Sequence, residues 1–312
     1  MGAERITARS FPTPDIVKTT NNPAAWDQLG GFAQVQAAEA NAALDLLDGR
    51  LEEAGSLEER VAAFEAAFRH VSEWRYQVAV QGQWTRPNSD AEAFRTPIAD
   101  GTWMDYKLTP MVGGREPGSP AFELVSELEQ VAKERLQNSV NVHNPVTLPD
   151  GRTITGNFLD QEFYPGLVIT GTARFADREQ LRRASFEILA GLETQRADEG
   201  GLDPHDPELR QKFSDAAYCL IQGPEMMRGS DSIMRTFLAA AHTRVFDAAP
   251  VLPQAIDLDG MVRGQEAFGE VMQKMKIATP STGRPVVGTG IDAGTERTAP
   301  KSLKRGGGLA RG

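Results

Sequence analysis

A short polar stretch between two apolar-patterned helices carries the residue types best suited to chemistry in this chain. It runs Gly-Pro-Glu-Met-Met-Arg-Gly-Ser over residues 223–230. The glycine and proline end one helix, and the next helix is expected to begin at Ser230. The first amides of a helix have no internal partner, and the helix dipole adds partial positive charge there. Because Arg228 lies directly before these amides, we predict a site for an anion such as phosphate.

Further side chains of the second helix fall near the same place. On a helical wheel of about 100° per residue, Asp231, Arg235 and His242 form a narrow stripe beside the broad apolar face. Arginine suits phosphate because its planar fork matches the phosphate oxygens. The predicted ligand-binding residues are Arg228, Gly229, Ser230, Ser232 and Arg235. The predicted catalytic residues are Asp231, Glu225 and His242.

A plainer interpretation of the same stretch stays open. Asp231 and Arg235 are four residues apart, the spacing of an ordinary ion pair on a helix surface. His242 stands alone on a helix flank, where a structural role is common. In this interpretation the stretch is only a tight turn between two helices.

Four elements are expected to position this stretch. Asp206-Pro207-Glu208 is a strong helix start and predicts a helix over residues 206–222, followed by a helix over 230–247. Asp177 caps a further helix over residues 177–194. Before it, Pro149-Asp150-Gly151 supplies the turn of a hairpin over residues 146–155. A second β segment is expected within residues 166–175.

The remaining chain predicts a mainly helical protein with a small antiparallel β element, an α+β fold. Apolar spacing predicts helices over residues 24–47, 56–71, 120–138 and 258–275. Alternation over residues 74–81 predicts a half-exposed strand, and residues 103–108 a short one. We expect one domain over residues 24–276, preceded by an extended arm over residues 1–23. Residues 277–312, with eight glycines and little apolar surface, are predicted to be a disordered tail.

This order of elements resembles the Fic and related Fido-fold transferases over residues 145–247. In that family a flap hairpin lies across a helix–loop–helix whose loop grips nucleotide phosphates, and the loop reads HPFxxGNGRxxR. Pro224 matches the family's proline, Gly229 its first loop glycine with one residue inserted, and Arg235 its final arginine. Gly223 stands where the catalytic histidine would be, and Ser232 where the first phosphate-binding arginine would be.

These departures make the chain similar to the avirulence B type of bacterial effectors, which lack the full motif. The resemblance implies a transferase of nucleotidyl or glycosyl type that modifies a protein hydroxyl. Its ligand would be a nucleotide or a nucleotide sugar. Arg228 and Arg235 would hold the diphosphate, and Asp231 or Glu225 would serve as the base.

The distribution of charge suggests an alternative to a transferase, namely a non-catalytic interaction protein. The formal net charge is −10, yet residues 277–312 hold six basic residues against two acidic ones, a net charge of +4. The acidic body argues against nucleic acid as a ligand. A helical scaffold whose basic tail mediates partner binding or export fits these charges equally well. In both interpretations a protein is the expected partner or acceptor.

Other sequence features narrow the setting of the protein. Hydrophobic residues make up 40% and charged residues 24%, as in ordinary soluble proteins. The single cysteine, Cys219, favours a reducing compartment. No apolar run could span a membrane, and the first residues lack a secretory signal. We therefore expect a cytoplasmic protein, or one exported without a signal peptide. The four histidines have no metal-ligand spacing, and a metal site is not expected.

Overall fold

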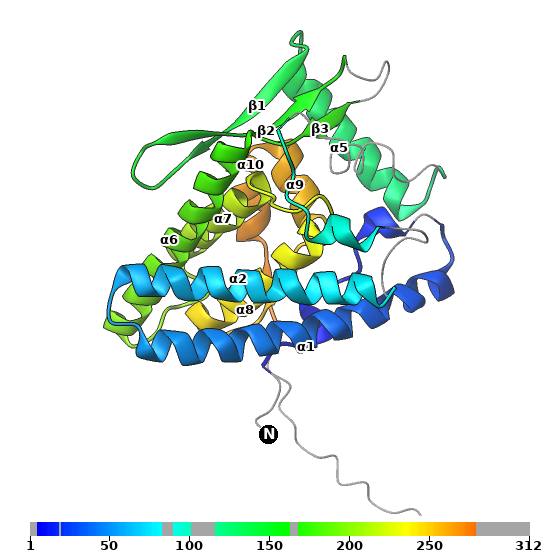
Figure 1. Ribbon diagram of the computed structural model, residues 1–312. Coiled ribbons are helices and arrows are strands. Elements are labelled where there is room, and N and C mark those ends of the chain that lie inside the picture. The colour runs from blue at the N-terminus through cyan, green and yellow to red at the C-terminus, as the bar shows by residue number, and fades with distance from the viewer. Residues whose placement is uncertain (1–4, 19, 83–89, 101–115, 163–167, 279–312) are drawn as a thin grey trace, which may run out of the picture. The chain divides into compact units, whose positions relative to one another are not determined.

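Two of the long helices begin at residues whose side chains cap them. Figure 1 shows the computed structural model, which describes residues 5–18, 20–82, 90–100, 116–162 and 168–278. Helix α1 (Pro23–Glu53) begins at Asn22, whose side chain accepts from the amide of Ala24. Helix α2 (Leu57–Val80) begins with the predicted capping box of Ser56 and Glu59. The two helices pack side by side. The described residues are mostly helical and also form two small antiparallel sheets, so the predicted mainly helical α+β class is confirmed.

The prediction of a strand over residues 74–81 is wrong, because these residues form the end of α2. Buried positions continue through this stretch at helical spacing, from Phe68 and Val71 to Arg75 and Val78. Over so few positions, the apolar residues that alternate in a strand pattern also fit the helical period of about 3.6 residues. Helix propagation from the capped start of α2 therefore outweighs the local strand pattern.

Three further helices surround the predicted site. Helix α6 (Phe175–Glu199) packs on α7 (Pro207–Gln222), and α8 (Ser230–Phe246) follows. The side chain of Asp206 accepts from the amides of Glu208 and Leu209 and so caps α7. Helix α8 contacts α1, α2, α6 and α7, and most of its residues are buried. It is the central helix of the described part of the chain.

A small sheet lies against the end of α7. Strands β1 (Asn141–Thr147), β2 (Thr153–Asp160) and β3 (Ile169–Gly171) pair antiparallel in that order. The predicted hairpin is confirmed, and its turn includes Gly151 with a positive φ of 82°. Gln222 joins the sheet to α7, because its side-chain oxygen accepts from the amide of Asn157 at 2.8 Å.

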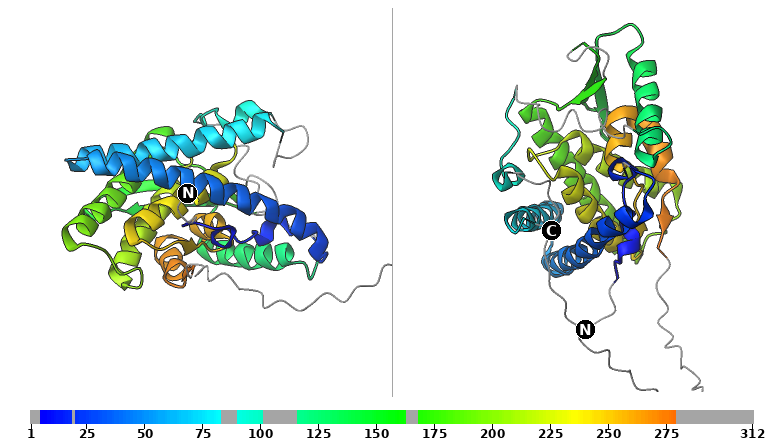
Figure 2. Two further views of the ribbon diagram at one scale, coloured as in Figure 1. Left: turned by 90° about the horizontal axis from the view of Figure 1, so that it is seen from below. Right: turned by 90° about the vertical axis from the view of Figure 1, so that its right-hand side faces the viewer.

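The C-terminal part of the described chain departs from the predicted single helix over residues 258–275. It forms α9 (Ile256–Arg263) and α10 (Gln265–Gln273), which are separated at Gly264 with a φ of 84°. Helix α5 (Pro120–Leu136) packs on α9, as Figure 2 also shows. Strands β4 (Pro250–Val251) and β5 (Lys276–Ile277) form a second small sheet.

The N-terminal residues are packed rather than extended. They include the short 3-10 helices η1 (Ala8–Ser10) and η2 (Asp15–Val17), which contact α1 and α5 respectively. Ile6 and Phe11 belong to the main core. Two isolated apolar anchors carry no periodic signal, which is why the sequence pattern does not reveal this packing. The 3-10 helix η3 (Ala91–Phe94) precedes a segment that contacts the predicted site.

Several expectations concern residues outside the described part. The strand over residues 103–108 and nearly all of the tail, residues 279–312, belong to this group. All of the described residues belong to one compact unit. Within them, no helix combines the length and apolarity needed to cross a membrane.

Candidate functional site

The loop between α7 and α8 is paired with η3 and with the segment that follows it. The amide of Met227 donates to the carbonyl of Thr96 at 2.9 Å, and the amide of Arg228 donates to the carbonyl of Ala93 at 3.1 Å. The amide of Ile98 donates to the carbonyl of Glu225 at 2.9 Å. Two amides of the predicted anion site are thus bonded within the protein. Residues 225–232, which we call the α7–α8 corner, are all half-buried.

The first turn of α8 begins where the sequence predicts. Gly229 precedes it with a φ of 81°, and a Cβ there would lie 2.8 Å from the ring of Phe94. Glycine is required at this position because it accepts positive φ and leaves room for that ring. The intrahelical bonds start at Ile233, whose amide donates to the carbonyl of Gly229 at 3.0 Å. The amides of residues 230–232 therefore lie outside the helix's own ladder.

The serines of this turn bond to carbonyl oxygens. Ser230 donates from its hydroxyl to the carbonyl of Met226 at 3.0 Å. Ser232 donates to the carbonyl of Gly229 at 2.9 Å. Both hydroxyls thereby fix the turn, and Ser232 also accepts a bond from an arginine that the sequence did not assign to the site.

That arginine is Arg75, at the end of α2. Its Nε donates to the Ser232 hydroxyl at 3.0 Å, and its guanidinium carbon lies 4.2 Å from the centre of the Phe94 ring. Arg75 is only 5% exposed, and burial lowers its pKa to about 10. It still carries its charge at neutral pH. The structure therefore adds a desolvated cation to the start of α8.

Arg235, a predicted phosphate ligand, is committed to the interior. It is 3% exposed, and its Nε donates to Asp231 at 2.6 Å. Its other nitrogens donate to the carbonyls of Pro253 at 2.8 Å and Gln254 at 2.7 Å. These bonds direct the guanidinium to the loop before α9. Arg235 therefore joins α8 to that loop, and its donors bond to Asp231 and to these two carbonyls within the protein.

The acidic candidates differ in their partners. Asp231 is partly exposed but shares Arg235 with the more buried Asp257, whose Oδ1 lies 3.3 Å from a guanidinium nitrogen. Burial, together with the nearby Asp231, raises the pKa of Asp257. Glu225 lies in the loop with its carboxylate 3.9 Å from Nε of Arg182. Of the two predicted bases, Glu225 has the looser ion pair.

His242 is a core residue. It is 1% exposed, and its Nδ1 lies 2.7 Å from the carbonyl of Ala248, the geometry of a donated bond. The rings of Phe213 and Phe246 pack against it. Burial lowers its pKa to about 4, so the imidazole is neutral at pH 7. It lies roughly 18 Å along the helix from Ser230, at about 1.5 Å per residue. The structure therefore favours the structural role over a catalytic one.

The position of the Fic-family histidine has no room for a side chain. A Cβ on Gly223 would lie 2.8 Å from the backbone oxygen of Arg178 and 3.1 Å from Cβ of Leu181. A histidine here would require α6 and α7 to separate. The close packing of α6 and α7 thus explains why position 223 holds a glycine rather than a histidine.

Comparisons with known proteins add no support to the resemblance to the Fic family. No protein-family model matches the chain, and no curated protein matches it significantly. Among the residues that the structure describes, no group of three or more histidine, cysteine, aspartate or glutamate side chains could hold a metal ion.

Proposed function

We propose that the α7–α8 corner binds a phosphate-bearing ligand, with Arg75 and Arg228 as its cationic groups. One observation carries the proposal. Arg75 lies against Ser232, so a buried positive charge sits beside the positive end of the α8 dipole. Two like charges of this kind repel each other. An anion at the same place would relieve that repulsion.

The repulsion between the Arg75 charge and the α8 dipole is modest, and it favours binding of an anion. A charge at a helix terminus changes stability by about 0.3–1 kcal/mol, unfavourably for a cation at the N-terminus. Burial increases such interactions, because the effective dielectric constant is lower than in water. Asp231 places a negative charge in the same turn, but this carboxylate is bonded to Arg235. The cation at Arg75 lies at the same turn, where its Nε bonds to the hydroxyl of Ser232.

The ligand class follows from the resemblance to Fido-fold transferases. We infer a nucleotide or a nucleotide sugar whose diphosphate lies at the start of α8. In nucleotidyl transfer the hydroxyl oxygen of a protein acceptor bonds to the α-phosphorus, the bond from that phosphorus to the bridging oxygen breaks, and pyrophosphate leaves. In glycosyl transfer the hydroxyl oxygen bonds to the sugar carbon, the bond from that carbon to the phosphate oxygen breaks, and the nucleoside diphosphate leaves. Glu225 accepts the hydroxyl proton in this scheme, because Asp231 is held by Arg235. A bacterial effector that modifies a protein hydroxyl would have this activity.

A second candidate is a helical interaction protein without catalysis. The observation that favours it is the packing of Gly223, Arg235 and His242, each of which is fixed by its surroundings in the core. In this case partner binding or export depends on the basic tail. Deletion of residues 279–312 would then abolish partner binding, whereas it would leave nucleotide binding at the corner unchanged.

A thermal-shift screen tests the first proposal. The full chain is titrated with pyrophosphate, nucleoside mono-, di- and triphosphates, and nucleotide sugars. At a hundredfold excess over the dissociation constant, a bound ligand stabilises the protein by about 2.7 kcal/mol. The Arg228→Ala variant should lose this shift, while Arg69→Ala, an exposed arginine on α2, should keep it. A flat response across the panel would remove the transferase interpretation and leave the interaction protein.

A further inference from the structure

Two arginines of α6, four residues apart, lie at the start of the loop between α7 and α8. Arg182 donates from Nη1 to the carbonyl of Gly223 at 3.4 Å, and Arg178 donates from Nη2 to the carbonyl of Ile98. The amide of Ile98 in turn donates to the carbonyl of Glu225 at 2.9 Å. Both guanidinium groups therefore contact the paired segments that lead into the α7–α8 corner.

Among the described residues, neither arginine has a carboxylate within hydrogen-bond distance. Nε of Arg182 lies 3.9 Å from Glu225, and Nη1 of Arg178 lies 4.0 Å from Asp100. Both cations are nevertheless well buried, since Arg178 is 1% exposed and the side chain of Arg182 is 12% exposed. Nε of Arg178 is buried without a hydrogen-bond partner. Because a buried charge is costly unless it is closely paired, the protein's own carboxylates compensate these two cations only weakly.

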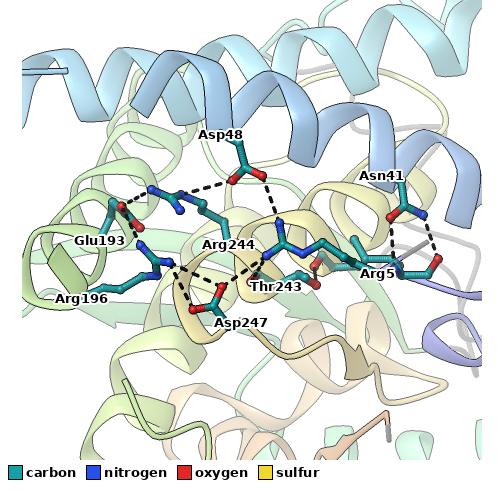
Figure 3. A network of polar contacts seen from close by, with 10 residues as sticks. Arg5, Asn41, Asp48, Glu193, Arg196, Thr243, Arg244 and Asp247 are labelled. Atoms are coloured by element: carbon teal, nitrogen blue, oxygen red, sulfur yellow. Dashed lines mark hydrogen bonds and ion pairs between the residues drawn. The ribbon is translucent and has the colours of Figure 1, made fainter. Parts of the chain in front are cut away.

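Arginines of similar burial elsewhere have much closer acidic partners. Arg244 donates to Glu193 at 2.6 Å, in the network that Figure 3 shows. Arg235 donates to Asp231 at the same distance of 2.6 Å. The long ion pair of Arg182 is thus not the usual arrangement of an interior arginine in this protein.

The charges of the two α6 arginines also repel each other. Burial lowers the pKa of Arg178, the carboxylate of Asp100 opposes this shift, and the charge of Arg182 adds to it. Residues four apart on a helix are neighbours, and like charges at this spacing are destabilising. An anion bound beside Arg182 would relieve this repulsion.

Arg182 is the member of the pair with capacity for a stronger bond. Both terminal nitrogens of Arg178 already donate to carbonyls, those of Ala173 and Ile98. The contacts of Arg182 are longer, at 3.4 and 3.9 Å. A charge-assisted bond from a guanidinium to a phosphate oxygen is about 2.7–2.9 Å long and therefore stronger. The neighbouring side chain of Glu225 is partly exposed, so this end of the loop reaches the protein surface.

We propose that Arg182 is a third cationic group of the anion site and that the ligand carries at least two linked phosphates. This inference rests on the proposed function of the α7–α8 corner. Glu225 and Arg228 are three residues apart in a segment that pairs with residues 93–98. At about 3.3 Å per residue, their Cα atoms lie about 10 Å apart. A chain of phosphates would follow the loop from Arg228 toward Arg182, so the ligand is a nucleoside triphosphate or a nucleotide sugar rather than a nucleoside monophosphate.

Calorimetric titration of the full chain with phosphate, pyrophosphate and tripolyphosphate at low salt tests this assignment. The Arg182→Gln variant should bind tripolyphosphate at least about tenfold more weakly than the wild type does, because it lacks the charge-assisted bonds. Its affinity for single phosphate should stay within about twofold of the wild type, since distant groups contribute independently. In the proposed site, Arg75 and Arg228 suffice for one phosphate at the start of α8.

Arg183→Gln is the matched control. It removes the same charge from the next position of α6, but the guanidinium of Arg183 donates to Glu58 at 2.6 Å and to Glu187 at 2.8 Å. These bonds direct it to the start of α2 and along α6. All three affinities should therefore equal those of the wild type. A difference between the variants of Arg182 and Arg183 separates a bound contact from a change in net charge.

Circular dichroism melting shows whether each variant is folded. If Arg182→Gln does not fold, Arg182→Lys replaces it, with Arg183→Lys as its control. Lysine keeps the charge but lacks the planar fork, so Arg182→Lys should bind tripolyphosphate about threefold more weakly. Equal affinities of an Arg182 variant and its Arg183 control would overturn the role of Arg182 and leave the site at the start of α8 intact. A wild type that binds none of the three anions would instead overturn the proposed function, and this inference with it.

Discussion

Arg75 donates from Nε to the hydroxyl of Ser232 across 3.0 Å, and this bond joins the end of α2 to the first turn of α8. The two residues are far apart in the sequence, and neither belongs to a recognisable motif together with the other. Their contact brings a buried cation to a helix N-terminus, the arrangement from which the phosphate site is inferred.

Gly229 is expected to be essential for the shape of the corner. Substitution by alanine should destabilise the protein by about 1–3 kcal/mol, because alanine is strained at positive φ and its Cβ would meet the ring of Phe94. Chemical denaturation measures this change. Gly191→Ala is the control, since nothing lies within 4 Å of its Cβ position, and it should be neutral or stabilising.

Placing a histidine at position 223, as the Fic motif would have it, should fail. Gly223→His should destabilise the protein strongly, and even Gly223→Ala should cost about 1–3 kcal/mol, because the added atoms meet the backbone of Arg178 and the side chain of Leu181. Circular dichroism melting of the two variants checks this. A Gly223→His variant as stable as the wild type would show that α6 and α7 can separate here.

Arg235 is expected to matter for stability rather than for ligand binding. Arg235→Ala leaves the carboxylate of Asp257 buried without its partner, which should cost about 3–5 kcal/mol. Urea denaturation measures this loss. The contrary result is a variant that keeps full stability but no longer binds the nucleotide, and it would return Arg235 to the phosphate site.

His242 should make the stability depend on pH. Its pKa is lowered from 6.5 to about 4 by burial, so the unfolded chain binds the proton more tightly. The stabilisation is complete above about pH 6.5 and is lost as the pH falls through about 4, by up to about 3 kcal/mol. His242→Asn retains a donor for the carbonyl of Ala248 and should flatten this part of the pH profile. A wild-type profile that is already flat between pH 6.5 and 4 would contradict the buried neutral imidazole.

The sequence predicts local structure well where caps and periodicity agree. The starts of α2 and α7 follow from Ser56 and Asp206, whose side chains accept from amides of the next few residues. Helix α8 begins at Ser230 as predicted, but its N-cap is Gly229 and no side chain caps it. The strand expected over residues 74–81 fails because a period read over so few positions does not separate a strand from the end of a long helix. Gly264 divides the last helix for a backbone reason that apolar spacing does not contain.

The site is harder to predict, because its contacts join distant segments. The spacing of Asp231 and Arg235 correctly suggests an ion pair, but burial beneath the loop of Pro253 and Gln254 depends on tertiary packing. One feature of the sequence could have pointed to Arg75 as part of the site: it is a charged residue on the buried face of α2. The buried face of a helix seldom holds an arginine without a specific partner.

The most direct test of the phosphate site is a calorimetric titration of the full chain with pyrophosphate at low salt. The wild type should bind with a measurable dissociation constant, and Arg228→Ala should weaken binding at least about tenfold, the effect of losing about 1.4 kcal/mol of charge-assisted bonding. Arg69→Ala should bind as the wild type does. No saturable heat with the wild type, or equal affinity for the wild type and Arg228→Ala, would contradict an anion site at the start of α8.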